Sequence, residues 1–294
     1  MDASVRRRTL LGLHIAVLLA GATGLFGRYI SISGIPLVWF RMMVGIVAMG
    51  IAMACMHKLH KVPFRSLLPI SACGVMLAIH WVAFFASIQE SNVSVGVACI
   101  ATSCFFTSVF DPLINRRKFS FAAFAISFIS IAGALVIFSL DIRYRTGILL
   151  GLASAALYSL FSIMNIRAGA KTGEDSSTML FHELISGFLF LSICVPVYSW
   201  IAPDAPIMPK VNDLIALIIL GSVLTVIPFL LQIIAMRRLS AFTVNVTYNL
   251  EPVYSIILAA ILFGETKELN LSFWTGLALI VLSVVLQTIR SGRK

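Results

Sequence analysis

Charged residues are scarce in this sequence: Asp, Glu, Lys and Arg make up 12% of its 294 residues, whereas soluble proteins carry about 25%. Acidic residues are the rarer kind, with 12 Asp and Glu against 22 Lys and Arg. Apolar residues supply 60% of the chain, above the usual figure of about 45–50%. A water-soluble fold of this length cannot bury such an excess, so the composition excludes an ordinary soluble domain and indicates a membrane protein.

The motifs of enzymes and cofactor-binding proteins are missing as well. The five cysteines lie inside apolar runs and form no CxxC pair, which argues against a disulfide framework or a zinc site. The run from His182 to Ser186 begins like the HExxH zinc motif, but Ser186 replaces its second histidine. The chain has no P-loop, dinucleotide fingerprint or GxSxG sequence. We therefore expect no cofactor, no metal and no enzymatic activity; the alternative is a membrane-embedded enzyme or a structural membrane protein without transport activity.

Apolar runs of about 20 residues predict an all-α membrane protein with ten transmembrane helices. The expected spans are residues 10–30, 35–56, 66–88, 92–115, 120–140, 147–168, 177–200, 212–235, 240–263 and 272–290. The first run could pass for a cleaved secretory signal. We expect it to stay as a span, because its Gly12 and Leu13 recur as Gly151 and Leu152 in a later span.

The basic residues separate into two unequal sets when they are assigned to alternate ends of the spans. One side carries Arg6, Arg7, Arg8, Lys58, Lys61, Arg65, Arg116, Arg117, Lys118, Lys171, Arg237, Arg238, Arg290, Arg293 and Lys294, and the other carries Arg143, Arg145, Lys210 and Lys267. The positive-inside rule then predicts that both termini are cytoplasmic. Because the basic residues follow the loops and do not gather on one face, the net charge of +10 does not predict a nucleic-acid partner.

Internal similarity divides the chain into two halves, residues 1–141 and 142–294, with five expected spans each. An odd number of spans forces the second half to enter the membrane in the opposite orientation to the first. Inverted repeats of this kind belong to carriers in which one half rocks against the other around a site near the bilayer midplane. The sequence leaves the oligomeric state open.

Short motifs in the second half resemble those of a known family. The LEPV run at residues 250–253, the pair Gly264 and Glu265, and the small-residue span GLALIVLSVVL occur in this order within the ten-span repeat. Together they resemble the EamA branch of the drug/metabolite transporter superfamily. The resemblance implies a bacterial inner-membrane carrier of small metabolites, with amino-acid exporters among its relatives. The first half departs from the pattern, because Ser103 stands where the second half has Pro252.

The ninth expected span contains an unusual number of polar groups for a membrane helix. Asn245, Tyr248 and Asn249 fall at i, i+3 and i+4 and predict one polar face. These side chains either bind the substrate or hydrogen-bond to neighbouring helices. Glu251 lies beside that face, about 17 Å into the span and so near the midplane. It either couples transport to a proton or cation, or pairs with a buried base.

Further candidate substrate-binding residues lie on other spans. The third span carries His80 and Trp81, and the sixth carries Tyr158 and Asn165. Each is either a cavity residue or a hydrogen-bonded packing residue. Arg41 lies about 9 Å into the second span, where it either attracts an anionic group of the substrate or pairs with a carboxylate or carbonyl inside the membrane.

His182 and Glu183 lie at a similar depth from the cytoplasmic side and are further candidates for ion coupling. We expect the site to be built from the third, fourth, sixth, eighth and ninth spans. Its aromatic and amide groups favour a small amphipathic solute such as an amino acid. The lack of a nucleotide-binding motif means that transport is passive or driven by a proton or other ion gradient. A channel is disfavoured, because the sequence has no charged ring or carbonyl-rich filter.

Overall fold

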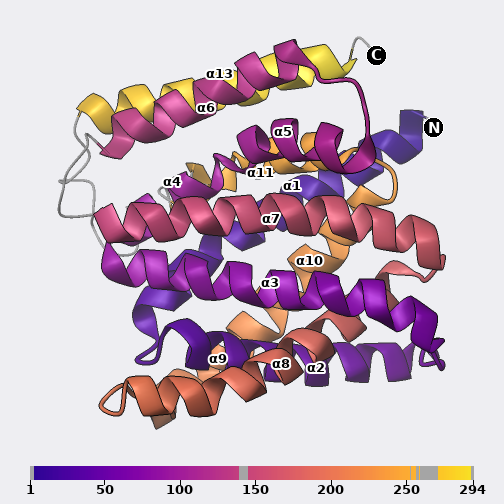
Figure 1. Ribbon diagram of the computed structural model, residues 1–294, viewed down its shortest axis with the longest axis vertical. Coiled ribbons are helices and arrows are strands. Elements are labelled where there is room, and N and C mark those ends of the chain that lie inside the picture. The colour runs from indigo at the N-terminus through magenta and orange to yellow at the C-terminus, as the bar shows by residue number, and fades with distance from the viewer. Residues whose placement is uncertain (1–2, 139–144, 252, 256–257, 259–270, 293–294) are drawn as a thin grey trace.

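The computed structural model describes residues 3–138, 145–251, 253–255, 258 and 271–292, and all of its regular elements are helices (Figure 1). These are α1 (Ala3–Tyr29), α2 (Gly34–Cys55), α3 (Phe64–Glu90), α4 (Val93–Ile100), α5 (Ser103–Asn115), α6 (Phe121–Phe138), α7 (Arg145–Thr172), α8 (Ser176–Ile201), η2 (Val211–Asp213), α9 (Leu214–Gly221), α10 (Val223–Met236), α11 (Ala241–Tyr248) and α13 (Leu271–Gly292). Pro252, Gly264 and Glu265 lie outside the described residues.

Within the described residues, seven helical segments are long and apolar enough to cross a membrane. They are Ser4–Tyr29, Gly34–Cys55, Phe64–Glu90, Val95–Asn115, Arg145–Thr172, Ser176–Ile201 and Val211–Met236. Two shorter apolar helices, Phe121–Gly133 and Trp274–Ser283, lie in the fifth and tenth expected spans. The predicted class, an all-helical membrane protein, is confirmed. The count of ten spans stays a prediction, because much of residues 240–263 lies outside the described part of the chain.

Three of the expected spans are broken helices. The span 92–115 is interrupted between α4 and α5, where the Thr102 hydroxyl donates to the Cys99 carbonyl at 2.6 Å. The span 212–235 is interrupted at Ser222, between α9 and α10, and Ser222 donates to the Ile218 carbonyl. Serine and threonine hydroxyls that bond a carbonyl of the preceding turn compete with the helix and bend it.

The third break follows α11 and repeats the geometry of the first. Helices α4 and α11 each have eight residues, and both their starts (93 and 241) and their ends (100 and 248) are 148 residues apart. Each begins with a side-chain cap: Asn92 accepts from the Val95 N–H at 2.8 Å, and Ser240 accepts from the Thr243 N–H at 3.1 Å. The two halves of the chain therefore contain the same short helix followed by the same interruption.

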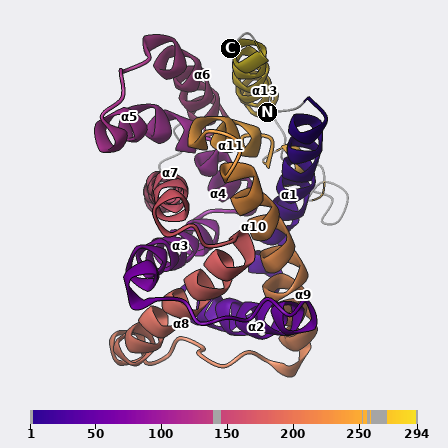
Figure 2. The same ribbon diagram turned by 90° about the vertical axis from the view of Figure 1, so that its right-hand side faces the viewer.

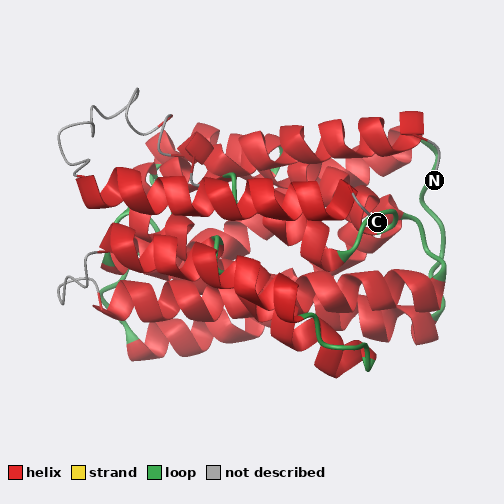
Figure 3. Cartoon of the chain, turned by 90° about the horizontal axis from the view of Figure 1, so that it is seen from above, coloured by secondary structure: helices red, strands yellow, loops and turns green. Residues whose placement is uncertain are grey.

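Helices from the first half pack mainly against helices from the second half. Helix α3 lies along α7 and α8, α1 lies along α10, and α6 lies beside α13 at one edge of the bundle (Figures 1 and 2). Helix α7 occupies the middle, with α3, α4 and α5 around it (Figure 2). Figure 3 shows the start of α1 and the end of α13 at the same side of the bundle. The core is thus an interface between sequence-distant helices.

Candidate functional site

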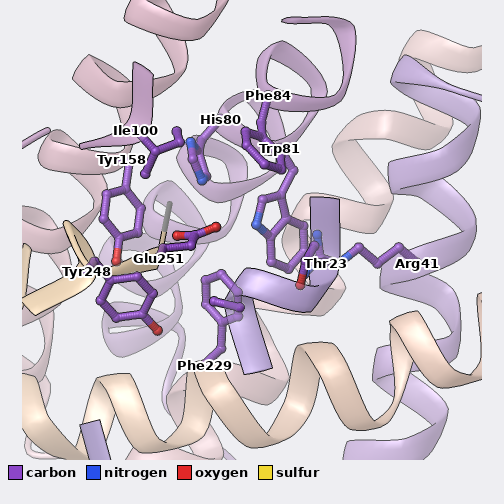
Figure 4. A pocket seen from close by; sticks show the side chains of 11 residues that line it. Thr23, Arg41, His80, Trp81, Phe84, Ile100, Tyr158, Phe229, Tyr248 and Glu251 are labelled. Carbon is purple, nitrogen blue, oxygen red and sulfur yellow. The ribbon is translucent and has the colours of Figure 1, made fainter. Parts of the chain in front are cut away.

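A small cavity lies where these helices meet, next to the breaks that follow α4 and α11. It is lined by Ala20, Thr23, Arg41, His80, Trp81, Phe84, Ile100, Tyr158, Phe229, Tyr248 and Glu251 (Figure 4). Its volume is about 40 Å³. A single water needs about 10–15 Å³, so this state has room for a few waters but not for a metabolite. The five spans expected to form the site all contribute lining residues, and α1 and α2 contribute as well.

Arg41 brings a positive charge to the cavity wall and is only 1% exposed. Its guanidinium carbon lies 3.8 Å from the centroid of the Trp81 ring, a cation–π contact. Its Nε donates to the hydroxyl of Thr225 at 2.8 Å. Its Nη1 has no hydrogen-bond partner among the described residues. A buried donor without a partner is costly, and Arg41 keeps this one hydrogen-bonding group unused in the structure.

Glu251 brings a negative charge to the same cavity and is 6% exposed. It follows the break after α11. Although the structure describes both side chains, no Glu251 oxygen lies within 4.0 Å of an Arg41 nitrogen. In the view of Figure 4 the Trp81 ring stands between the two. The cavity therefore presents a cation and an anion that are separated by an aromatic ring and do not neutralise each other by direct contact.

Three aromatic side chains form the wall nearest Glu251. The ring of Tyr158 lies 5.1 Å from His80 and 5.6 Å from Tyr248, measured between centroids. The Nδ1 of His80 donates to the Ser154 carbonyl at 2.9 Å, so a neutral ring carries its lone pair on Nε2. Tyr158 accepts from the side chain of Gln232 at 2.8 Å. The hydroxyl of Tyr248 has no hydrogen-bond partner within the described part of the chain.

Asn245 does not line this cavity, although it is completely buried. Its Nδ2 donates to the Thr107 hydroxyl at 2.7 Å, and its Oδ1 accepts from the Ser162 hydroxyl at 2.9 Å. These bonds join α11 to α5 and α7. Asn245 therefore hydrogen-bonds to neighbouring helices in this structure, which is one of the two alternatives given above. The other alternative, that Asn245 binds substrate, stays a prediction.

The side chain of Asn249 forms hydrogen bonds at the helix breaks and, like that of Asn245, does not line the cavity. With the amide oriented so that its nitrogen faces carbonyls, it donates to Ala101 O at 2.9 Å and to Asn245 O at 3.1 Å. In that orientation its oxygen accepts from the Ser130 hydroxyl at 3.2 Å. Ala101 lies at the break after α4, and Asn249 itself lies at the break after α11. One side chain therefore links the interrupted helices of the two halves.

The remaining predicted residues lie away from the cavity. Asn165 on α7 donates to Glu183 on α8 at 2.6 Å, and both side chains are fully buried. His182 is half-buried, and its Nδ1 contacts the Thr178 carbonyl of its own helix at 2.9 Å. The structure thus brings Arg41, His80, Trp81, Tyr158, Tyr248 and Glu251 together, and places Asn165, His182 and Glu183 in a different part of the bundle.

Sequence reasoning missed the contributions of α1 and of Phe229 and Gln232. The signal for α1 was the spacing of Gly21, Gly24 and Gly27, since a row of small residues marks a helix that packs closely in a membrane bundle. A side chain at Gly21 would lie 2.9 Å from the Cβ of Tyr254, and one at Gly24 would lie 3.0 Å from Val93. Close packing of this face is what brings α1 to the cavity.

Comparisons with known proteins agree with one another. The profile of the EamA-like transporter family matches residues 7–139 and 145–289. The threonine/homoserine exporter RhtA of Escherichia coli strain K12 is 27% identical over 202 residues, which cover 68% of this chain and 64% of RhtA. The uncharacterized transporter YxxF of Bacillus subtilis strain 168 is 20% identical over 94% of this chain and 88% of its own length. A solved crystal structure superposes with a TM-score of 0.72 over 95% of this chain and 97% of its own, at 17% identity, which shows a shared fold.

Proposed function

Because the chain belongs to the EamA-like transporter family, we propose that it is a secondary transporter that exports an amino acid or a related small metabolite by alternating access. Two inverted five-helix repeats, residues 1–141 and 142–294, form the moving halves. The separate profile matches to each half support this division. So do the equal lengths and constant offset of α4 and α11. Interrupted helices beside a central site are typical of transporters of this architecture.

The observation that carries the choice of substrate is the pair of opposite charges in one cavity. An amino acid presents a carboxylate and an ammonium group on the same small molecule. Arg41 has an unused Nη1 donor for the carboxylate, and Glu251 supplies an acceptor for the ammonium group. Tyr158 and Tyr248 supply apolar walls with hydroxyl groups. Charges at this depth in a membrane protein are expensive and usually serve a function.

The small volume of the cavity supports alternating access. About 40 Å³ cannot hold an amino acid, so the halves must separate before a substrate enters. The printed name of RhtA supports export as the direction and threonine or a similar amino acid as the first substrate to test. A proton or ion gradient drives the cycle in this proposal, with Glu251 as the coupling group inside the cavity.

We place the protein in the bacterial inner membrane with both termini in the cytoplasm. The uneven distribution of lysine and arginine between the two sets of loops supports this orientation. The start of α1 and the end of α13 lie at the same side of the bundle, as the orientation requires (Figure 3).

Transport by purified protein in liposomes tests the proposal. Labelled threonine and homoserine are compared with analogues that lack either the carboxylate or the amino group, with and without a proton gradient. We expect Arg41→Gln to reduce uptake of the zwitterion about 10- to 100-fold, because a hydrogen bond to a charged group contributes about 1.5–3 kcal/mol. Arg65→Gln, at an exposed position in the first turn of α3, is the matched control and keeps wild-type rates. Equal rates for Arg41→Gln and wild type, or no movement of any zwitterion, would overturn the proposal.

A further inference from the structure

Glu183 is a buried carboxyl group outside the cavity. It lies on α8, about 10 Å from the start of that helix at Ser176, and its side chain is completely inaccessible. Its Oε1 accepts from Asn165 Nδ2 at 2.6 Å. Its other oxygen, Oε2, has no hydrogen-bond partner in the described structure, and neither has Asn165 Oδ1. The same two side chains therefore share one good hydrogen bond and leave one oxygen each without a partner.

Protonation of Glu183 accounts for both unpartnered oxygens. An ionised carboxylate and an amide oxygen are both acceptors and cannot bond one another. Because Nδ2 and Oε1 already join the two groups, a single proton on Oε2 would supply the donor that Asn165 Oδ1 lacks. The result is a carboxylic acid–amide pair in which each side chain donates once and accepts once. Leaving two buried oxygens without partners would cost about 1–3 kcal/mol each, and an unpaired buried carboxylate would cost more.

Among the described residues, no lysine or arginine forms an ion pair with Glu183. Arg237, beyond the end of α10, donates to the Glu174 carbonyl and to Met179 Sδ, and forms no ion pair with Glu183. The α3 face brings the thiol of Cys73, which is buried.

The other neighbours of Glu183 include a thioether and an imidazole. Helix α2 brings the thioether of Met42 against Gly187 of α8, the helix that carries Glu183. On α8 itself, His182 is hydrogen-bonded to the Thr178 carbonyl. Arg237 attracts an ionised Glu183 without contacting it, but the complete burial of the carboxyl group outweighs this attraction and favours the neutral form.

We propose that Glu183 is a proton-binding site separate from the substrate cavity, with Asn165 as the partner that holds the protonated form. Proton binding converts the carboxylate to the acid, and the proton comes from water on the cytoplasmic side. Both side chains are buried where α7 and α8 pack on α3, so the proton exchanges only when this packing opens. Protonation of Glu183 thereby favours the packed arrangement of these helices.

Helix α7 connects this site to the cavity. Tyr158 and Asn165 are seven residues apart and share a face of α7, about 10 Å from each other along its axis. A movement of α7 that widens the cavity also pulls Asn165 from Glu183. This link to transport rests on the proposed function, whereas the protonation of Glu183 does not.

Infrared spectroscopy of the reconstituted protein tests the protonation directly, with the spectrum of each variant subtracted from that of the wild type. The wild type should show a carboxylic-acid C=O band at neutral pH that disappears in Glu183→Gln and remains in the matched variant Glu251→Gln. Glutamine keeps an acceptor for Asn165 Nδ2 and a donor for Asn165 Oδ1, so Glu183→Gln should fold and melt close to wild type. Asn165→Leu, which leaves Glu183 intact, should shift the band to higher frequency by removing its hydrogen bond.

The results separate this inference from the proposed function. If wild type and Glu183→Gln have the same carboxylic-acid band at neutral pH, Glu183 is ionised and the proposal is wrong. An Asn165→Leu spectrum identical to that of wild type also overturns it. A Glu183 band in a protein that moves no solute supports the proton site and counts against the transporter. Loss of the proton-gradient dependence of uptake in Glu183→Gln supports both.

Discussion

At the scale of single residues, the polar side chains of this bundle do two kinds of work. Arg41, Tyr248 and Glu251 face the cavity, and Arg41 and Tyr248 each keep one polar atom there without a hydrogen-bond partner among the described residues. Asn245 and Asn249 instead hydrogen-bond to neighbouring helices. The sequence showed that these groups lie inside apolar runs. The sequence could not show which of these groups face the cavity. The expected polar face assumed an unbroken helix, but α11 ends at Tyr248, so helical periodicity does not place Asn249 and the residues after it.

The role of Asn249 leads to a stability prediction. Asn249→Leu should lower the free energy of unfolding by about 1–3 kcal/mol, because the carbonyls of Ala101 and Asn245 lose a buried donor. Thermal or detergent-induced unfolding of the purified protein measures the change. Asn212→Ala, at an exposed position, is the control and should stay within about 0.5 kcal/mol of wild type. Equal losses in the two variants would show that the link between the helix breaks contributes nothing.

At the scale of elements, the packing of α3 on α8 depends on two glycines. A Cβ added at Gly74 would collide with the carbonyl of Glu183 and the hydroxyl of Ser186, and would lie 2.7 Å from Glu183 Cα. One added at Gly187 would lie 2.8 Å from the Gly74 carbonyl. Backbone atoms cannot rotate away as a side chain can. The two helices therefore approach closely only because both positions are glycine.

Gly74→Ala should consequently destabilise the protein by about 1–3 kcal/mol, the usual cost of overpacking. The matched control is Gly12→Ala on α1, where an added Cβ would lie 3.5 Å from the flexible end of Leu231. This control should be neutral or more stable by about 0.5–1 kcal/mol, because alanine is the better helix former. Melting temperatures of the two variants in detergent check the prediction, and similar values for both would contradict it.

At the scale of the whole molecule, a contact between loops joins the two halves. His60, between α2 and α3, lies with Nε2 3.0 Å from a carboxylate oxygen of Glu174, between α7 and α8. The hydrogen bond from this carboxylate raises the pKa of His60 above its ordinary value, helped by the Lys58 carbonyl. The contact therefore contributes fully below the ordinary histidine pKa of about 6.5 and is lost as the pH rises through the raised pKa of the folded protein.

Titration of labelled His60 by NMR tests this contact. Glu174→Gln removes the main hydrogen bond that favours the charged ring, so the pKa of His60 should fall back toward the ordinary value. Glu90→Gln is the control, because Glu90 is exposed and lies at the end of α3 remote in sequence from this loop. A His60 titration that is the same in both variants would mean that the loops of the two halves do not hold each other.

The sequence by itself determined that this protein is an all-helical membrane protein of the EamA type, and it singled out the charged and aromatic groups that meet in the cavity. Those conclusions depend on composition and local motifs, since charges in apolar runs are costly wherever the helices lie. Only the tertiary structure decided that α1 and Phe229 complete the cavity and that Asn249 joins the helix breaks. It also decided that Asn165 meets Glu183. Helical periodicity assigns a side chain to a face only within an unbroken helix. Which helix packs against that face depends on contacts between segments far apart in the chain.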